Sequence, residues 1–207
     1  MIYLSDDYLE KYIDTLAYIL ERATYEEYSF DSIQKRIAYS SMINEFEKSN
    51  ITLIAFSSNE SLYQDIFPYK ENRGYKHNIY GVYGWIAECY IRLFLELNIT
   101  FELLFIILPI ELMLEKYKLY HEMSFSHVFD LFHELVLYSY LDNVLKYRSL
   151  STNDLAIKTG IPFSSINALR YNKRDINKLE SSKLLTISRV LSIKMESLLT
   201  NIYLEKM

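Results

Sequence analysis

The strongest constraint on the fold of this chain is the stretch STNDLAIKTGIPFSSINALRYN, residues 151–172, because it predicts two short helices joined by a tight turn. Ser151 or Thr152 is expected to cap the first helix, and Asp154 lies in its first turn, where the helix dipole favours an acidic side chain. Gly160 is expected to end that helix, since a residue without a Cβ atom readily adopts the left-handed backbone that a helix end needs.

The second helix of this motif follows Pro162, which suits a first helical position because its missing N–H costs no hydrogen bond there. Its outward residues are Phe163, Ser164, Asn167, Ala168 and Arg170. Many pairs of helices contain such a turn, so the surrounding sequence has to decide what the motif is. Apolar spacing predicts that the inward residues are Leu155, Ala156, Ile161, Ile166 and Leu169.

Two more amphipathic helices are predicted downstream, with apolar positions at Leu179, Leu184, Leu185, Ile187, Val190, Leu191, Ile193, Met195, Leu198 and Leu199. With them, the last third of the chain resembles the phage-repressor/Cro-type (Xre-like) helix-turn-helix family. The resemblance implies a five-helix, lambda-repressor-like DNA-binding domain, which we place at residues 137–207. The matching positions are Leu155, Ala156, Gly160, Ile161, Ile166, Leu169, Leu185, Ile187, Leu191 and Leu198.

The resemblance also implies which side chains contact DNA. Base contacts are expected from the start of the second helix, at Phe163 and Ser164, and one turn later at Asn167 and Ala168. Few of these side chains are long and polar, so we expect modest base readout with a bias towards A·T pairs. The phosphate contacts implied at the edges of the motif are Thr152, Tyr171, Lys173 and Arg174, with Arg170 as a further DNA-binding candidate.

Asn172 stands where many relatives have glycine, and asparagine also tolerates a left-handed backbone, so the turn is expected to survive. An alternative remains open, in which the motif is kept as a fold for protein contacts after DNA binding was lost.

The whole chain is predicted to be all-α, because 207 residues include only four glycines and three prolines. ITLIAF, residues 51–56, has the propensity of a strand but no clear partner, so a short extended piece and part of a helix both remain open. A long loop is expected around Pro68, Asn72, Gly74 and Asn78. Helices are predicted at 6–23, 31–47, 81–98, 100–108 and 109–120, and from 126 to 148 as one element that would couple two domains rigidly.

The net charge changes sign near the start of the predicted DNA-binding domain. Residues 141–207 contain 11 Lys and Arg against 6 Asp and Glu, a balance of +5, which leaves −10 for residues 1–140 out of a net −5. A basic module gains affinity by neutralising phosphates, whereas an acidic one is repelled by the duplex. An ordinary solvated charge pattern is the alternative. We therefore expect an acidic helical domain at 1–136, for oligomerisation, sensing or partner binding.

Nothing in the sequence points to an enzyme, a cofactor or a metal site. The four histidines, including His121, His127 and His133 at intervals of six, do not form an i, i+4 ligand pair, and the glycines are too scattered for a phosphate loop. Cys89 shares an apolar face with Trp85 and is expected to be buried rather than nucleophilic. An enzymatic N-terminal domain is the least favoured alternative and would require a polar pocket near His121 or Tyr120.

Tyrosine is unusually frequent, at 20 of 207 residues. Several tyrosines in the middle of the chain are candidates to line a groove or an interface, unless they only reflect codon bias. They are Tyr75, Tyr80, Tyr83, Tyr90, Tyr117 and Tyr120.

Together these features predict a cytoplasmic transcriptional regulator that binds double-stranded DNA as a homodimer. A lone cysteine, an acidic N-terminus and apolar runs too short to span a bilayer favour the cytoplasm over export or a membrane. The alternative is an antitoxin whose acidic domain neutralises a protein toxin and which regulates its own operon. The segment WIAECYIRLFLELN…LPIELMLEKYKLYHEMSF loosely resembles uncharacterised bacterial helix-turn-helix-associated, antitoxin-like proteins.

Overall fold

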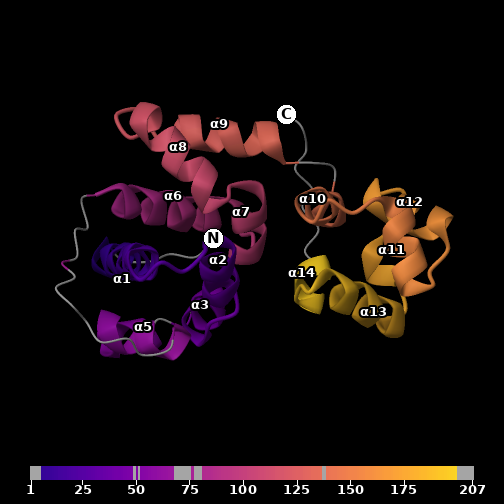
Figure 1. Ribbon diagram of the computed structural model, residues 1–207, viewed down its shortest axis with the longest axis horizontal. Coiled ribbons are helices and arrows are strands. Elements are labelled where there is room, and N and C mark those ends of the chain that lie inside the picture. The colour runs from indigo at the N-terminus through magenta and orange to yellow at the C-terminus, as the bar shows by residue number, and fades with distance from the viewer. Residues whose placement is uncertain are drawn as a thin grey trace. The chain divides into compact units, whose positions relative to one another are not determined.

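The computed structural model describes residues 6–48, 50, 52–67, 76, 81–136 and 139–199. Over these residues it contains fourteen α-helices, one 3-10 helix and no strand (Figure 1), which confirms the all-α prediction. No helix in this part of the chain is both long and apolar enough to cross a membrane. The chain divides into two compact units, residues 1–131 (unit 1) and 132–207 (unit 2), and α9 (Ser126–Leu135) runs across the division.

Unit 1 is built around two long helices that lie side by side, α1 (Asp6–Tyr25) and α6 (Val82–Leu97) (Figure 1). Shorter helices pack around this pair: α2, α4 and α5 against α1, and α7 and α8 against α6. Their bounds, with α3 between α2 and α4, are α2 Phe30–Ala38, α3 Ser41–Glu47, α4 Thr52–Phe56, α5 Asn59–Ile66, α7 Phe101–Ile107 and α8 Ile110–Tyr120.

Apolar side chains that recur at helical spacing on α1 and α6 form the core of unit 1. Leu16 and Leu20 of α1 are fully buried, as are Ile86 and Leu93 of α6. Cys89 is 2% exposed, as expected for a core residue, and burial raises the pKa of its thiol far above the ordinary value. The cysteine is therefore protected rather than activated.

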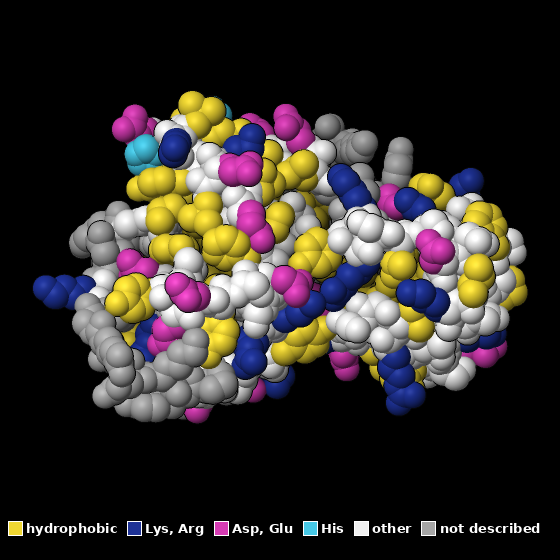
Figure 2. All heavy atoms as spheres, in the orientation of Figure 1, with side chains coloured by type: hydrophobic (Ala, Val, Ile, Leu, Met, Phe, Trp, Pro, Cys, Tyr) yellow, Lys and Arg dark blue, Asp and Glu magenta, His cyan; other side chains and the backbone are white. Residues whose placement is uncertain are grey.

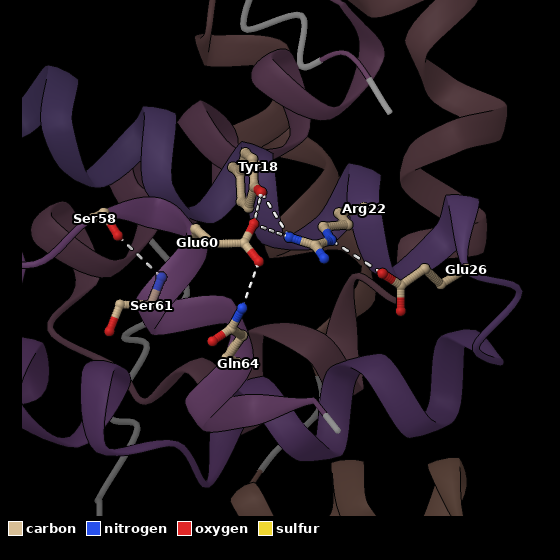
Figure 3. A network of polar contacts seen from close by, with 7 residues as sticks. All are labelled: Tyr18, Arg22, Glu26, Ser58, Glu60, Ser61 and Gln64. Carbon is tan, nitrogen blue, oxygen red and sulfur yellow. Dashed lines mark hydrogen bonds and ion pairs between the residues drawn. The ribbon is translucent and has the colours of Figure 1, made fainter. Parts of the chain in front are cut away.

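A buried arginine joins α1 to α5. Arg22 is 1% exposed, donates from Nε to Glu26 Oε1 at 3.0 Å and pairs through Nη1 with Glu60 of α5 (Figure 3). The Tyr18 hydroxyl donates to the same Glu60 carboxylate at 2.6 Å, and the guanidinium lies 4.2 Å from the centroid of the Tyr63 ring. A guanidinium withdrawn from water needs such partners, so this network fixes the two helices together.

The predicted helix at 31–47 is in fact two helices, because a serine caps the second one. Ser40 has an extended backbone, and its hydroxyl accepts a hydrogen bond from the Ile43 N–H at 3.2 Å. The chain therefore bends after Ala38 and restarts at Ser41. The apolar residues at helical spacing in both helices are nevertheless buried: Ile33, Ile37, Ile43 and Phe46.

The open question at 51–56 is settled as a helix, since α4 covers Thr52–Phe56 and its Ile54 is buried. The expected loop around Pro68, Asn72 and Gly74, with Asn78, falls outside the described residues.

The predicted continuous helix from 126 to 148 is wrong. α9 ends at Leu135, and a new helix, α10 (Tyr140–Tyr147), begins after Ser139, whose hydroxyl accepts from the Asp142 N–H at 3.0 Å. A serine in extended conformation interrupts the apolar periodicity here, as Ser40 does in unit 1.

Unit 2 has the five α-helices that the family resemblance implies (Figure 1). They are α10, α11 (Thr152–Thr159), α12 (Phe163–Arg170), α13 (Ser181–Leu191) and α14 (Met195–Leu199), with a 3-10 helix at Ile176–Lys178. Leu184, Ile187, Leu191 and Leu198 are buried as predicted, but Leu185 is 41% exposed, because it lies on the opposite side of α13 from Ile187 and Leu191.

Candidate nucleic-acid interface

The first helix of the motif, α11, begins with a complete capping box. The Ser151 hydroxyl accepts from the Asp154 N–H at 3.0 Å, and the Asp154 carboxylate accepts from the Ser151 N–H at 2.9 Å. Hydrogen bonds from the Ser151 side chain and backbone lower the pKa of Asp154 below its ordinary value. Two N–H groups that the helix leaves unpaired are thereby satisfied, which fixes where α11 starts.

Gly160 ends α11 with φ 69° and ψ 10°, in the left-handed region. Its N–H donates to the Ala156 carbonyl at 2.9 Å. A Cβ atom at this position would meet no other atom within 4 Å, so backbone conformation alone favours glycine here. Pro162 is the N-cap of α12, one position before the helix rather than inside it.

Asn172 closes α12 at φ 53°, the left-handed conformation expected for it. The N–H of Lys173 then donates to the Ala168 carbonyl at 2.8 Å, and that of Asn172 to the Leu169 carbonyl at 3.2 Å. These bonds satisfy carbonyl groups at the helix end and bring the chain sharply back.

The inward face of the motif is apolar, as predicted. Leu155, Ile166 and Leu169 are at most 2% exposed and Ile161 is 5% exposed, whereas Ala156 is only half-buried. α11 packs against both α12 and α13. The orientation of α12 is therefore set by a small hydrophobic seam that leaves its opposite side free.

The opposite side of α12 carries the predicted base-contacting residues. Phe163 is 52% exposed and Ser164 is exposed, both in the first turn, while Asn167 and Ala168 are half-buried one turn later. A half-exposed phenylalanine at a helix start has no role in the core of unit 2, so it is available for an apolar contact such as a thymine methyl group.

Two cations follow α12 in the turn. Lys173 and Arg174 are exposed, and neither has an acidic partner among the described residues. Tyr171 is 39% exposed and lies beside Arg170, whose guanidinium carbon is 5.3 Å from the ring centroid. Cations without internal partners are free to neutralise phosphates.

Arg170 and Thr152 are placed differently from the other predicted contact residues. The Arg170 Nε donates to Asp142 Oδ1 at 2.5 Å, and its Nη1 donates to the Thr152 hydroxyl at 2.9 Å. Thr152 is 5% exposed, and Asp142 is 3% exposed. Arg170 therefore ties α12 to both α10 and α11, and we call these three residues the Arg170 bracket.

Two residues of this arrangement were not predicted, Ser139 and Asp142. The Ser139 hydroxyl also donates to the Arg170 carbonyl at 2.7 Å, so one side chain links the start of α10 to the end of α12. The signal was present in the sequence as Ser139-Tyr-Leu-Asp142, which has the spacing of a capping box. This signal was overlooked because one continuous helix was predicted across Ser139.

The surface charge of unit 2 fits a polyanionic partner. On the face drawn in Figure 2, Lys and Arg side chains are spread over this unit with few Asp or Glu side chains between them. Over the described residues, no group of three or more His, Cys, Asp or Glu is placed to hold a metal ion. The groups present on this surface are suited to binding: exposed cations, hydroxyl and amide groups, and the exposed aromatic rings of Phe163 and Tyr171.

Comparison with known proteins identifies the C-terminal region. Neither the comparison with curated proteins nor the one with solved structures gives a match. A family model does match, over residues 140–202, from the first residue of α10 to just beyond α14. The C-terminal third of this chain is therefore a Cro/C1-type helix-turn-helix DNA-binding domain.

Proposed function

We propose that the chain is a sequence-specific transcriptional regulator in which α12 is the recognition helix. In domains of this type the second helix of the motif enters the major groove and its first residues reach base edges. Phe163 and Ser164 stand at that position and are exposed, while Leu169 holds the other side of the helix in the core. The observation that carries the proposal is that the first turn of α12 is exposed while the opposite side of the helix is packed in the core.

In this proposal Lys173, Arg174 and Tyr171 contact the phosphate backbone, which sets affinity rather than sequence preference. Arg170 and Thr152 act through each other: the Arg170 bracket sets the angle at which α12 is presented. Arg170 still lies close enough to the surface for a phosphate contact, since its side chain is 24% exposed.

We further propose that the regulator acts as a homodimer in the cytoplasm. Dimers of such domains bind half-sites about one helical turn apart, at a spacing of roughly 34–36 Å. Unit 1, with the acidic balance of the N-terminal region, supplies oligomerisation, sensing or partner binding rather than DNA contact.

The proposal is tested by selecting genomic fragments with the purified full-length protein. We expect enrichment of a small set of promoter fragments that share a two-fold symmetric site, and loss of that enrichment in Phe163→Ala/Ser164→Ala with general DNA affinity retained. Equal binding to all fragments would contradict sequence-specific regulation. The control is Leu185→Ala, which removes an exposed apolar side chain of the same unit on α13.

The acidity of residues 1–140, at −10, favours a second candidate function, an antitoxin that neutralises a basic protein toxin and regulates its own operon. A small basic reading frame co-transcribed with this gene, whose product is toxic alone and harmless with this protein, would support it. If no neighbouring product binds the protein in co-expression, the antitoxin function is excluded and the regulator remains.

A further inference from the structure

Unit 1 contains a pocket between three of its helices that DNA binding does not use. Its volume is about 640 Å³, within the range of small-molecule sites, and its walls come from the start of α1, the first half of α6 and the end of α8. Gly81, the N-cap of α6, and Gly84 within it form part of the lining, which leaves room where larger side chains would fill the space.

One wall of the pocket is a row of aromatic rings. Trp85 meets Tyr117 edge to face, with ring centroids 5.6 Å apart, and Tyr117 stacks on His121 at 4.5 Å. His121 is held in place because its Nδ1–H donates to the Tyr117 carbonyl at 2.7 Å. The electron-rich faces of such rings attract cations, with indole the strongest.

The rest of the lining has three acids and one cation, Arg92, together with the apolar Leu9 and Ile13. Asp6 and Glu10, one turn apart on α1, line the pocket and have no cationic partner among the described residues. Glu88 also lines it, but Glu88 is paired with Arg92 at 2.7 Å, so this carboxylate is already neutralised. The pocket therefore has two carboxylates without an ion-pair partner among the described residues, together with the aromatic rings in its lining.

We propose that this pocket binds a small organic cation, an ammonium or guanidinium group on an apolar body. The carboxylates supply the negative charge that attracts the ligand. The rings of Trp85 and Tyr117 contact its apolar body and its cationic group. An anion would meet Asp6 and Glu10 unscreened, and a neutral ligand would leave them unused. The site lies wholly within unit 1, so it needs no residue of unit 2.

Trp85 makes the proposal directly testable, because it is the only tryptophan in the chain. The full-length protein is titrated with benzylamine and with agmatine while the fluorescence emission of Trp85 is followed. Each titration is repeated by calorimetry, which also detects binding that does not change the fluorescence. Benzyl alcohol is the uncharged counterpart of benzylamine. We expect saturable binding of both cations, no saturable binding of benzyl alcohol, and weakening of the complexes by added salt.

Variants locate the binding. Asp6→Asn/Glu10→Gln is expected to raise the Kd for agmatine about tenfold, and Tyr117→Leu several-fold, by removing the charge and the aromatic wall respectively. Glu96→Gln, which removes an exposed acid from the far end of the same α6, is the matched control and should leave the Kd unchanged. Circular dichroism checks that each variant folds as the parent does.

The proposal would be overturned by the absence of a saturable signal with either cation by both methods, by an equal response to benzyl alcohol, or by a Kd that does not change in Asp6→Asn/Glu10→Gln. A peptide with one central arginine separates the sources of the cation. If it binds more tightly than agmatine, the pocket is a protein-docking site and the assignment to a small molecule is wrong. DNA binding is not part of the measurement, so failure here leaves the proposed regulator function untouched.

Discussion

The Asp142 carboxylate accepts a hydrogen bond from Arg170 with 2.5 Å between Oδ1 and Nε, although 28 residues separate them in the chain. Asp142 is almost fully buried, and this guanidinium is its ion-pair partner. The same guanidinium donates to Thr152 of α11. Three helices of unit 2 thus meet at a single charged side chain, next to the proposed DNA-contacting turn.

Removing either charge of this pair is expected to destabilise unit 2. Asp142→Ala leaves a partly buried guanidinium without its partner, and Arg170→Ala leaves a buried carboxylate without its partner, so each should cost about 2 kcal/mol. Urea denaturation followed by circular dichroism measures the loss, and hydrogen exchange at the amides of α10–α12 locates it. The double variant should cost less than the sum of the two single changes.

An exposed ion pair in the same unit provides the control. Glu180 and Lys183 lie 2.9 Å apart at the start of α13 with both side chains largely exposed, and losing that pair should cost at most about 0.5 kcal/mol. Arg170→Lys keeps the charge but cannot present two N–H groups in one plane to Asp142 and Thr152, so it should behave more like Arg170→Ala than like the parent. Full stability in Arg170→Lys would show that charge alone holds the bracket.

Local chemistry in the sequence accounts for much of this fold. Ser151, Gly160 and Asn172 define the ends of α11 and α12 through preferences that depend only on near neighbours, and all three occupy the expected positions. Apolar spacing likewise identifies the buried residues of α1 and α6. Such signals act over a few residues, so they can be read before the tertiary structure is known.

Features that depend on distant residues could not be predicted. Periodicity places Arg170 on the outward face of its helix. Its side chain links two helices only because the fold brings Asp142 of α10 close to it. The unit 1 pocket likewise joins Asp6 on α1 to Tyr117 on α8. The two wrongly predicted continuous helices have another cause. Ser40 and Ser139 carry a local capping signal, but the apolar periodicity continues past them and predicted unbroken helices.

A second prediction concerns the two left-handed residues of the motif. Gly160→Ala should cost about 1 kcal/mol, because φ of 69° is unfavourable for a residue with a Cβ atom although the space around it is open. Asn172→Ala should cost a similar amount, whereas Asn172→Gly should be tolerated. Denaturation midpoints of the three variants check this, and a neutral Gly160→Ala would mean that the turn can rearrange.

The third prediction is a pH dependence in unit 1. The hydrogen bond from Tyr18, followed by those from Gln64 and Arg22, lowers the pKa of Glu60 below its ordinary value. A lowered pKa in the folded state contributes stability that is present above the ordinary carboxyl pKa of about 4.3 and is lost as the pH falls through the folded value. We therefore expect the denaturation midpoint of unit 1, followed by Trp85 fluorescence, to drop below about pH 4.

Glu60→Gln tests the origin of that acid sensitivity. It keeps the shape of the side chain and removes the titrating group, so the midpoint should be lower at neutral pH and should fall less steeply in acid. Glu96→Gln, on the surface of α6, is the comparison that should preserve the acid response of the parent. An unchanged pH profile in Glu60→Gln would assign the acid sensitivity to other carboxyl groups.

The last prediction separates phosphate contacts from base contacts. Binding that releases counterions falls with salt, and each phosphate neutralised contributes about 0.9 to the slope of log K against log salt. Lys173→Gln/Arg174→Gln should therefore reduce that slope by about 2 and weaken binding to every sequence alike, whereas Phe163→Ala should keep the slope and change the preferred sequence. Lys35→Gln removes a cation of unit 1 that is already paired with Asp31 at 2.6 Å, and it should alter neither property. Fluorescence anisotropy with the selected site and a scrambled duplex over a range of salt concentrations measures both, and an unchanged slope in the double variant would place the phosphate contacts elsewhere on the domain.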